Sequence, residues 1–452
     1  MARLFGTDGV RGIANQDLNC ELVFRIGQAG ARVLTSDGKK PRILIARDTR
    51  ISGKMLYCAL AAGITSVGAD VIDLGVLPTP GVAHLVCEYR ADAAVMISAS
   101  HNSYEYNGIK WFNGEGFKLS DQLEDQIERL VRNEERSELP TGAHIGIIMQ
   151  AHNALHDYTR HLLSAVRKPL DGLHIVLDCA NGAASAVAPR LFQQLGMRVH
   201  TLANAPDGIN INAGCGSTHP ERLQQEVVAL GADAGFAFDG DADRLIGVDE
   251  KGALVDGDRM LAICGVDMKR RGVLQKNTVV GTQMTNLGMK LHMQKEGITV
   301  IPTDVGDRYV LERMRACGYN LGGEQSGHLI FLDCSSTGDG MLSAIQLLNV
   351  MADSQKSLST LASRCEIFPQ ILLNVKVAPE KKEGWKQNIA IQNRMAAVEQ
   401  QLGPTGRVLV RASGTEPLLR IMLEGENQAQ IQSHAMDIAV CMIEELDGEI
   451  CG

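Results

Sequence analysis

The sequence predicts an α/β fold with largely parallel sheets, divided over several domains. Short apolar runs alternate with longer amphipathic ones along the 452 residues, and this alternation is typical of strand–helix units. A chain of this length also exceeds what one hydrophobic core supports, so more than one domain is expected. In addition, several apolar runs lead directly into polar loops, which is where ligands bind in open α/β sheets.

Buried strands are expected where apolar residues follow one another without interruption. These runs are residues 43–46, 94–97, 175–177, 234–238 and 279–280. A helix is expected over residues 121–136, because its apolar residues fall on one face and its charges on the other. Polar stretches near residues 133–153, near residues 249–257 and before Phe368 are the expected boundaries. The four predicted domains are residues 1–150, 151–252, 253–366 and 367–452.

Composition indicates an ordinary globular protein, with 45% hydrophobic and 21% charged residues. The 44 Lys and Arg residues against 53 Asp and Glu leave a formal net charge of −9, which argues against nucleic-acid or anionic-membrane binding. The 11 cysteines are scattered without a C-x-x-C pair, as is typical of reduced thiols. With no apolar signal core and no membrane-length apolar stretch, a cytoplasmic location is expected.

The segment Asp239-Gly240-Asp241-Ala242-Asp243-Arg244 follows a buried apolar run. Three carboxylates at alternate positions repel one another unless a cation lies among them, and ligation by oxygen alone suits Mg²⁺. A calcium-binding EF-hand is rejected, because Arg244 stands at the sixth position, where that loop needs glycine. An aspartyl-phosphate enzyme that uses Asp239 and Asp241 stays open, although it leaves Ser100 without a role.

The segment Ser98-Ala99-Ser100-His101-Asn102 follows another expected strand and precedes Asn107-Gly108-Ile109-Lys110. A serine beside a histidine invites a serine-hydrolase interpretation, but the sequence has no G-x-S-x-G elbow. Taken alone, two serines in such a loop are more often helix caps than nucleophiles. A catalytic role for this segment is therefore supported only when it is considered together with the other loops.

Two further loops and the N-terminal segment carry polar groups whose function the sequence leaves open. Around Ser413 and Gly414, hydroxyls, a permissive backbone and the guanidinium groups of Arg411 and Arg420 suit a phosphate, although a capped turn between strands is equally consistent. The segment Gly322–His328 offers side chains that read hydroxyl groups, or is merely a Gly-rich connector. In Phe5–Gly12, Arg11 is either a phosphate partner or a surface charge. No P-loop motif is present.

Together, the segments S-A-S-H-N, D-G-D-A-D-R, G-E-Q-S-G-H and R-A-S-G-T-E-P resemble the α-D-phosphohexomutase superfamily over essentially the whole chain. The opening F-G-T-D-G-V-R-G and residues 206–212 and 216–219 resemble its bacterial phosphoglucosamine mutase family. The resemblance implies three related α/β domains with mixed, mostly parallel sheets and a smaller α+β C-terminal domain around a central cleft. One loop per domain, in chain order the phosphoserine, metal-binding, sugar-binding and phosphate-binding loops, would face that cleft.

The resemblance also implies roles for individual residues. Ser100 would carry the transferable phosphate, and one Mg²⁺ would be held by Asp239, Asp241, Asp243 and an oxygen of the phosphoserine. The implied substrate-binding residues are Thr7, Arg11, Arg244, Glu324, Ser326, Arg411, Ser413, Gly414, Thr415 and Arg420. Lys110 and His328 are both candidates for the general base, and His101 is expected to orient the loop.

The implied reaction converts glucosamine 6-phosphate to glucosamine 1-phosphate through a bound sugar 1,6-bisphosphate, which also serves as the activator. It would feed amino-sugar nucleotide and cell-envelope precursor synthesis. The alternatives that stay open are a phosphomannomutase or phosphoglucomutase, a phosphatase that uses Asp239, and a sugar-phosphate binding protein without turnover. A phosphosugar is the expected partner, and a homodimer is compatible with the sequence.

One departure from the family pattern concerns the loop of Ser100. The family loop usually reads S-A-S-H-N-P, whereas Ser103 stands here in place of the proline. Loss of a fixed φ is expected to loosen the loop. We expect this to affect the rate more than the reaction.

Overall fold

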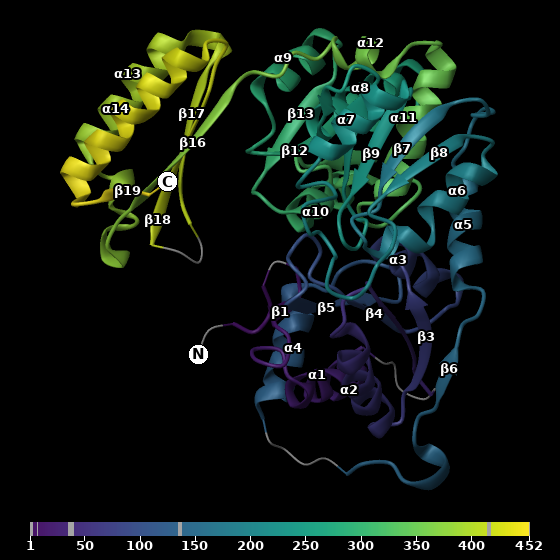
Figure 1. Ribbon diagram of the computed structural model, residues 1–452. Helices are drawn as coiled ribbons and strands as arrows, with labels where there is room; N and C mark the ends of the chain where they lie inside the picture. The colour runs from purple at the N-terminus through teal and green to yellow at the C-terminus, as the bar shows by residue number, and fades with distance from the viewer. Residues whose placement is uncertain (1–2, 7, 35–39, 134–137, 414–416, 452) are drawn as a thin grey trace. The chain divides into compact units, whose positions relative to one another are not determined.

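The computed structural model describes residues 3–6, 8–34, 40–133, 138–413 and 417–451. The strands of this part of the chain form four sheets. The chain divides into two compact units. We call Met1–Met284 with Gly297–Ser363 the large unit, and Thr285–Glu296 with Arg364–Gly452 the small unit (Figure 1).

The first sheet of the large unit has the strand order β1-β5-β4-β2-β3-β6. Its strands are β1 (Val10–Ile13), β2 (Arg42–Arg47), β3 (Asp70–Val76), β4 (Ala93–Ile97), β5 (Tyr106–Asn113) and β6 (Ile148–Gln150). Strands β4, β2, β3 and β6 are parallel, whereas β5 is antiparallel to β4 and β1. The helices of this region are α1 (Cys20–Val33), α2 (Gly53–Ser66), α3 (Thr79–Glu88) and α4 (Asp121–Arg132). Apolar residues of α1, α2 and α4 share one core with the sheet.

The second sheet has the order β11-β10-β9-β7-β8. It consists of β7 (His174–Asp178), β8 (Arg198–Leu202), β9 (Ala234–Phe238), β10 (Leu245–Asp249) and β11 (Leu254–Val255), with helices α5 (Ala154–Ser164), α6 (Ala188–Gln194) and α7 (Glu221–Leu230). Strands β8, β7 and β9 are parallel, and β10 turns back against β9 as a hairpin. The turn of this hairpin carries Asp239, Asp241 and Asp243.

The third sheet has the order β13-β12-β14-β15. Its strands are β12 (Thr278–Thr282), β13 (Thr299–Thr303), β14 (Leu321–Gly323) and β15 (Leu329–Phe331), and the helices are α8 (Gly257–Arg270), α10 (Asp307–Cys317), α11 (Gly340–Ser354) and α12 (Leu358–Ala362). Strand β12 is parallel to β13 and β14, and β15 is antiparallel to β14.

The small unit contains an antiparallel sheet of order β17-β18-β16-β19. Its elements are α9 (Leu287–Lys295), β16 (Gln370–Lys376), α13 (Ile389–Leu402), β17 (Arg407–Ala412), β18 (Leu418–Glu424), α14 (Gln428–Leu446) and β19 (Glu449–Cys451). Helices α13 and α14 pack on one face of this sheet and share its core (Figure 1). Short 3-10 turns complete the chain: η1 (Gly142–His144), η2 (Ala183–Ala186), η3 (Gln275–Asn277), η4 (Pro379–Lys381), η5 (Gly384–Lys386) and η6 (Gly403–Thr405).

The predicted fold class is confirmed: three sheets are mixed and mostly parallel, and the fourth, smaller one is antiparallel. The expected strand 234–238 coincides with β9, and the other expected strands lie within longer ones. The expected helix at 121–136 begins at Asp121, because Ser120 accepts a hydrogen bond from the Leu123 amide as its N-cap. It ends at Arg132, and residues 134–136 of the expected range lie outside the described residues.

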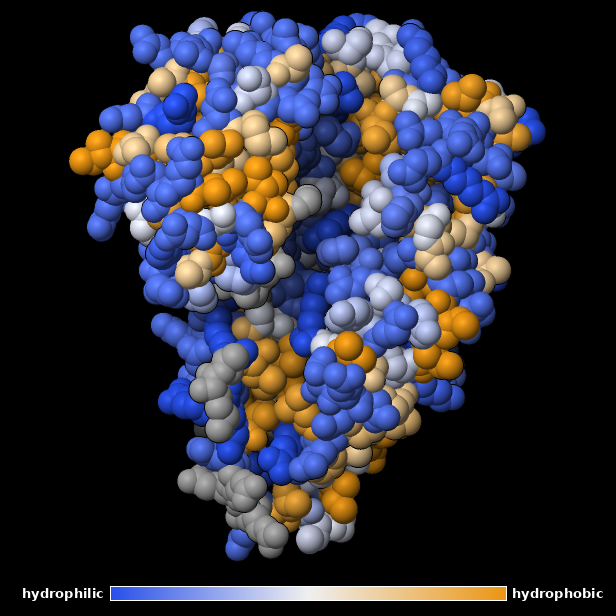
Figure 2. Space-filling view, turned by 60° about the vertical axis from the view of Figure 1, so that its left-hand side comes forward, coloured by the Kyte–Doolittle hydropathy of each residue, from blue (hydrophilic) through white to orange (hydrophobic). Residues whose placement is uncertain are grey.

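The surface in Figure 2 is mainly polar, with apolar residues in several small groups. Exposed apolar side chains are normal for a folded protein and need no separate explanation. None of the helices in the described part of the chain is long and apolar enough to cross a membrane.

Candidate active site

Ser100 lies in the segment Ser98–Asn107, which we call the serine loop and which includes the first two residues of β5. The fully buried strand β4 leads into this loop, and β5 leads out of it antiparallel to β4. Ser100 is buried and has a φ of 54°, in the left-handed region that an L-residue adopts only at a cost. Its Oγ donates a hydrogen bond of 2.5 Å to Oδ2 of Asp239. The predicted phosphate carrier therefore touches the predicted metal-binding segment.

The metal loop, residues Asp239–Arg244, joins β9 to β10. Asp239, Asp241 and Asp243 are buried and each offers a carboxylate oxygen within 4.8 Å of the others, the one such cluster among the described residues. Neither Asp241 Oδ1 nor Asp243 Oδ1 has a hydrogen-bond partner in the described structure. Burial, with the charges of Asp243 and Asp241, raises the pKa of Asp239 to about 8. A divalent cation would satisfy these oxygens and relieve the repulsion, so the donor set fits Mg²⁺.

The metal loop and the serine loop are in direct contact at Gly240. A Cβ atom at this position would lie 2.5 Å from the carbonyl oxygen of Ser100. A side chain at position 240 would therefore force the two loops apart. Asp241 is held in addition by Thr79 at the start of α3, whose Oγ1 donates to Asp241 Oδ2 at 2.6 Å.

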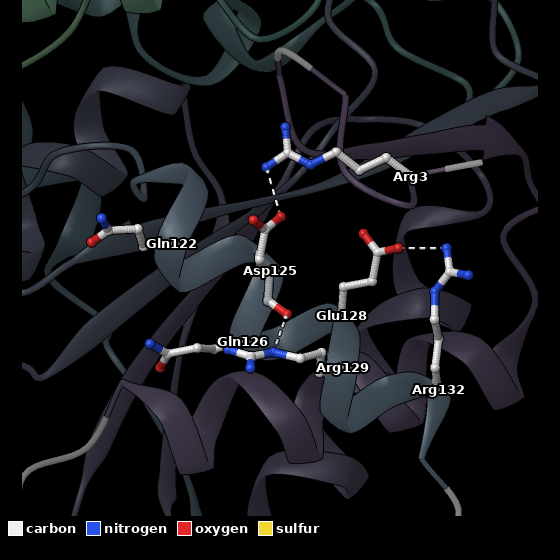
Figure 3. Close-up of a pocket in the computed structure, with 7 residues that line it drawn as sticks. All are labelled: Arg3, Gln122, Asp125, Gln126, Glu128, Arg129 and Arg132. Atoms are coloured by element: carbon white, nitrogen blue, oxygen red, sulfur yellow. Dashed lines mark hydrogen bonds and ion pairs between the residues drawn. The ribbon is translucent and has the colours of Figure 1, made fainter. Parts of the chain in front are cut away.

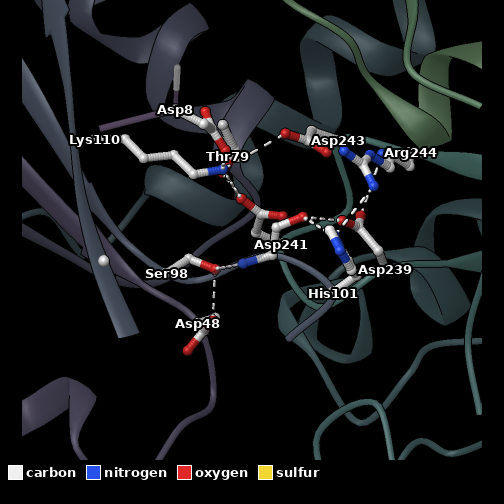
Figure 4. Close-up of polar contacts among 12 residues, drawn as sticks. Asp8, Asp48, Thr79, Ser98, His101, Lys110, Asp239, Asp241, Asp243 and Arg244 are labelled. Carbon is white, nitrogen blue, oxygen red and sulfur yellow. Dashed lines mark hydrogen bonds and ion pairs between the residues drawn. The ribbon is translucent and has the colours of Figure 1, made fainter. Parts of the chain in front are cut away.

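Lys110 of β5 is buried among carboxylates (Figure 4). Its Nζ donates to Asp241 Oδ2 at 2.8 Å and lies 3.0 Å from Asp8 Oδ2 and 3.7 Å from Asp243 Oδ2. Burial opposes the charged form, but the three carboxylates outweigh it and raise the Lys110 pKa above its usual range. Lys110 is therefore held protonated here, whereas a lysine acting as general base needs a lowered pKa.

His328, Lys118 and Asp307 extend the cluster of charged residues around Lys110, and Asp8 links Lys118 to Lys110. Lys118 Nζ lies 2.6 Å from Asp8 and 2.5 Å from Asp307. His328 lies 3.4 Å from Asp307 and 3.6 Å from Asp243. A closed ring results, in the order Lys110, Asp8, Lys118, Asp307, His328 and Asp243, because Asp243 lies 3.7 Å from Lys110; Asp241 is attached to the ring at Lys110. Sequence reasoning missed Asp8, Lys118 and Asp307 in this role, and only Asp8 belongs to a segment that it singled out.

His101 lies beside the metal loop as a neutral acceptor. Arg244 Nη1 is 3.1 Å from His101 Nδ1, and arginine can only donate, so Nδ1 accepts. Burial, Arg244 and Arg11 lower the His101 pKa to about 4. Ser100 Oγ is 3.5 Å from the same nitrogen, which is already occupied by Arg244. This contact argues against a serine hydrolase that uses His101 as its base.

The sugar loop, residues Glu324–His328, joins β14 to β15. Glu324 Oε1 accepts from the Gly306 amide at 3.1 Å, and Ser326 is exposed. Gly327 has a φ of 92° and packs against the carbonyl oxygen of Leu245, where a Cβ atom would clash. Leu245 directly follows the metal loop, so the sugar loop is held beside it.

The predicted phosphate-binding residues Arg411 and Arg420 belong to the small unit. They are directly opposite each other on the antiparallel strands β17 and β18. Burial and the charge of Arg420 lower the pKa of Arg411. Like charges in this position destabilise a sheet unless an anion lies between them. Ser413 is buried and its amide donates to the Leu418 carbonyl at 2.8 Å.

Three predicted residues, Thr7, Gly414 and Thr415, lie outside the described residues. Arg11 is described, and its guanidinium is paired with Asp8.

A hollow along α4 is lined by Arg3, Gln122, Asp125, Gln126, Glu128, Arg129 and Arg132 (Figure 3). Its charges are paired with one another, for example Arg3 with Asp125 at 3.1 Å. No predicted site residue lines it, so the chemistry belongs to the metal and serine loops.

Family models match the chain in four consecutive parts. The phosphoglucomutase/phosphomannomutase alpha/beta/alpha domains I, II and III match residues 2–138, 156–252 and 256–368, and the C-terminal domain of the same family matches residues 372–440.

Similar proteins cover almost the whole chain. A protein of Symbiobacterium thermophilum named phosphoglucosamine mutase is 54% identical over 449 residues, which is 99% of this chain and 100% of the relative. A protein of the same name from Acetivibrio thermocellus is 52% identical over 98% of this chain and 99% of its own. A solved phosphoglucomutase/phosphomannomutase family protein of Burkholderia thailandensis, 25% identical, superimposes with a TM-score of 0.81 over 99% of both chains. The N-acetylphosphoglucosamine mutase of Aspergillus fumigatus, at 16% identity and a TM-score of 0.70 over 98% of this chain and 96% of its own, shares the fold.

Proposed function

The chain belongs to the phosphoglucomutase/phosphomannomutase family, and from this premise we propose that it interconverts glucosamine 6-phosphate and glucosamine 1-phosphate. The predicted resemblance to bacterial phosphoglucosamine mutases is confirmed by relatives of that name at 52–54% identity over nearly the full chain. The enzyme is thus a mutase that acts on a phosphosugar. Its product would supply amino-sugar nucleotide and cell-envelope precursors.

One observation carries the assignment of the site: the Ser100 hydroxyl donates to Asp239 inside a cluster of three buried carboxylates. A hydroxyl that carries a phosphate needs a cation beside it, because the phosphoserine adds a charge of about −1.5 to −2. The metal loop supplies the ligands for that cation within contact of Ser100. We assign one Mg²⁺ to Asp239, Asp241 and Asp243; it would offset charge on the transferring phosphoryl group.

In the proposed reaction, the bond between phosphorus and Ser100 Oγ breaks while the sugar O1 bonds to phosphorus. The proton of the O1 hydroxyl leaves to a general base, and Ser100 Oγ takes up a proton as it leaves phosphorus. The resulting sugar 1,6-bisphosphate turns over in the site. Ser100 then takes the phosphoryl group from O6 while its hydroxyl proton leaves to the base, and O6 regains a proton. Lys110 and His328 stay the two candidates for proton transfer, and the protonated Lys110 is suited to giving the proton back.

The remaining groups hold the substrate in this proposal. Glu324 and Ser326 would bind sugar hydroxyls, since the sugar loop is packed beside the metal loop. Arg244 and Arg11 would contact the transferring phosphate, and His101 would orient the serine loop. The other phosphate is assigned to Arg411, Ser413 and Arg420, with Gly414, Thr415 and Thr7 as further predicted contacts. The four domain ranges, a homodimer, a cytoplasmic location and the lack of nucleic-acid or membrane binding stay predictions.

The test is an assay of the purified protein with Mg²⁺, a trace of sugar 1,6-bisphosphate and the 6-phosphates of glucosamine, glucose and mannose in parallel. We expect glucosamine 6-phosphate to have the highest kcat/KM by about 10²-fold or more, and Ser100→Ala to be inactive. A preference for glucose or mannose would overturn the substrate assignment alone. Release of inorganic phosphate without mutase turnover would instead favour a phosphatase that uses Asp239.

A further inference from the structure

Ser100 is held in a backbone conformation that its own side chain does not favour. With a φ of 54°, it lies in the left-handed region, where Cβ crowds the backbone. The loop also lacks the proline that the family pattern places at position 103. Such a conformation persists only where the surrounding structure enforces it.

Most of the side-chain hydrogen bonds that hold the carbonyl oxygens of the serine loop in place come from Arg50. Its guanidinium is buried and donates four hydrogen bonds to carbonyl oxygens of the serine loop. Nη2 donates to Ser100 at 2.9 Å and to Asn102 at 2.8 Å, and Nη1 donates to Tyr106 at 3.0 Å and to Ser103. One planar group thus spans the loop from the serine to the start of β5, including the residue that replaces the proline.

Asp48 ties the same arrangement to the amide of Ser100. Its Oδ2 accepts from Arg50 Nε at 2.9 Å and from the hydroxyl of Ser98 at 2.6 Å. The Ser98 hydroxyl in turn accepts from the Ser100 amide at 2.9 Å, and Figure 4 shows Ser98 directed at Asp48. The N–H of Ser100 is therefore linked to the buried Asp48 carboxylate through the Ser98 hydroxyl. The C=O of Ser100 is linked to the same carboxylate through the Arg50 guanidinium.

Asn212, from the loop after β8, completes the set from the second sheet. Its Nδ2 donates to the carbonyl oxygens of Ser100 and Asn102, both at 2.9 Å. The Ser100 carbonyl thus accepts from Arg50 and Asn212 while Gly240 packs against it. The contact places the serine loop relative to the metal loop that follows β9.

We propose that Arg50, Asp48 and Asn212 are positioning residues for phosphoryl transfer, which hold Ser100 in its left-handed conformation with Oγ aimed at the metal loop. The inference rests on the proposed function, because it matters only if Ser100 carries the phosphate. All three act through the backbone of Ser100 and none touches its Oγ. Four carbonyl oxygens require the fork of a guanidinium, and an ammonium group has neither its reach nor its geometry.

The test compares Arg50→Lys with Arg167→Lys. Arg167 is a matched control, because its guanidinium also makes several bonds, to Asp267, Asp353 and Gln346, but in a cluster remote from the serine loop. For both variants we would measure kcat and KM for glucosamine 6-phosphate, the rate of Ser100 phosphorylation by glucose 1,6-bisphosphate from intact mass, and the melting temperature.

We expect Arg50→Lys to lower kcat and the phosphorylation rate by about 10²-fold, since a shift of about 1 Å at a reacting group has that effect. KM should change less than about threefold, because Arg50 does not contact the substrate. Arg167→Lys should lower the melting temperature and leave kcat within about twofold. A kcat of Arg50→Lys within threefold of wild type, or an equal loss in Arg167→Lys, would overturn the inference.

A second variant covers the case in which Arg50→Lys does not fold. Asn212→Ala removes two hydrogen bonds to the serine loop and keeps the Arg50 contacts, so we expect kcat to fall about tenfold with KM little changed. Wild-type kcat in Asn212→Ala would count against the inference. Turnover by Ser100→Ala would overturn the proposed function together with it, whereas an inactive Ser100→Ala beside a fully active Arg50→Lys would overturn the positioning role alone.

Discussion

The large unit contains two clusters of acids and bases, each around a buried carboxylate, that look alike in composition but differ in how they are paired. In the cluster around Asp267, the carboxylate is bonded to Arg167 at 3.1 Å, to Arg270 at 2.8 Å and to Arg271 at 2.8 Å. Asp353 binds Arg167 and Lys168 in the same way. Almost every acidic group there faces an arginine, which is charged at any relevant pH.

The cluster around the metal loop is arranged differently. Its bases are two lysines, a histidine and Arg244, and two of its carboxylate oxygens have no hydrogen-bond partner in the described structure. Burial and mutual repulsion raise the pKa of Asp239 to about 8. A cluster built only for stability would not leave acceptors unsatisfied in the interior. The difference indicates that the first cluster links the segment after α5 to helices α8 and α11, and that the second has a donor set that fits a divalent cation.

Activity gives the largest expected contrast between the two clusters. Asp239→Asn removes the charge of a proposed metal ligand that also accepts from the Ser100 hydroxyl, so kcat should fall by about 10²–10³-fold, the range for loss of one electrostatic group at a reacting centre. Asp267→Asn lies outside the site and should leave kcat within about twofold. The measurement is kcat with saturating glucosamine 6-phosphate and Mg²⁺. Equal losses in the two variants would remove the distinction drawn here.

Stability should show the opposite order. Asp267→Asn leaves three arginines around a neutral amide, but their side chains are 22%, 57% and 30% exposed, so solvent screens part of the loss. Its free energy of unfolding should therefore fall by about 1–2 kcal/mol. Asp239→Asn replaces a carboxyl group that is costly to ionise in the fold, with a pKa of about 8, by an amide that cannot ionise, so in EDTA its free energy of unfolding should equal or exceed that of wild type. Urea unfolding in EDTA measures both, and an Asp239→Asn protein less stable than Asp267→Asn would contradict the comparison.

The residues of the metal-loop cluster differ in how far the sequence could predict their contacts. Asp239, Asp241 and Asp243 stand at alternate positions after a strand, so their convergence follows from local geometry. Asp8 and Asp307 meet at Lys118, although they are 110 and 189 residues away from it along the chain. No local sequence pattern predicts such a contact, and Lys118 lies in none of the motifs. Long-range packing alone assembles the rest of the ring.

The serine loop shows a second limit. The segment S-A-S-H-N pointed to Ser100 only through its resemblance to a family, because a serine after a strand is not specific. Asp48 and Arg50 closely follow the apolar run 43–46, but Arg50 binds carbonyl oxygens, which every residue carries and which therefore leave no trace in the sequence. The alternation of apolar and amphipathic runs, by contrast, depends on local periodicity, and it predicted the fold class correctly.

Dependence on pH sharpens the comparison further. The folded-state pKa of Asp239, about 8, lies above the ordinary carboxyl value, so its protonated form is favoured by folding. The stability that this provides is complete below the unfolded pKa and is lost as pH rises toward 8. We therefore expect the melting temperature of wild type in EDTA to fall between pH 5 and pH 8 more steeply than that of Asp239→Asn. Mg²⁺ should abolish this difference, because it stabilises the ionised carboxylates; equal slopes in EDTA would contradict the assigned shift.

The smallest expected effect concerns Ser103, where the chain departs from the family pattern. The sequence alone predicts a looser serine loop and a slower enzyme, but Arg50 bonds to the Ser103 carbonyl and to three others around it. Because the loop is already fixed from the side of its carbonyl oxygens, Ser103→Pro should change kcat by less than about threefold and raise the free energy of unfolding by at most about 1 kcal/mol.

The same substitution should matter more where the carbonyl contacts are weakened. In an Arg50→Lys background, the proline would restrict a loop that has lost its guanidinium, so Ser103→Pro should raise kcat more there than in wild type. The double-mutant cycle measures this coupling directly. An additive result would mean that the proline and Arg50 restrict different motions, and that the departure at position 103 is compensated elsewhere in the loop.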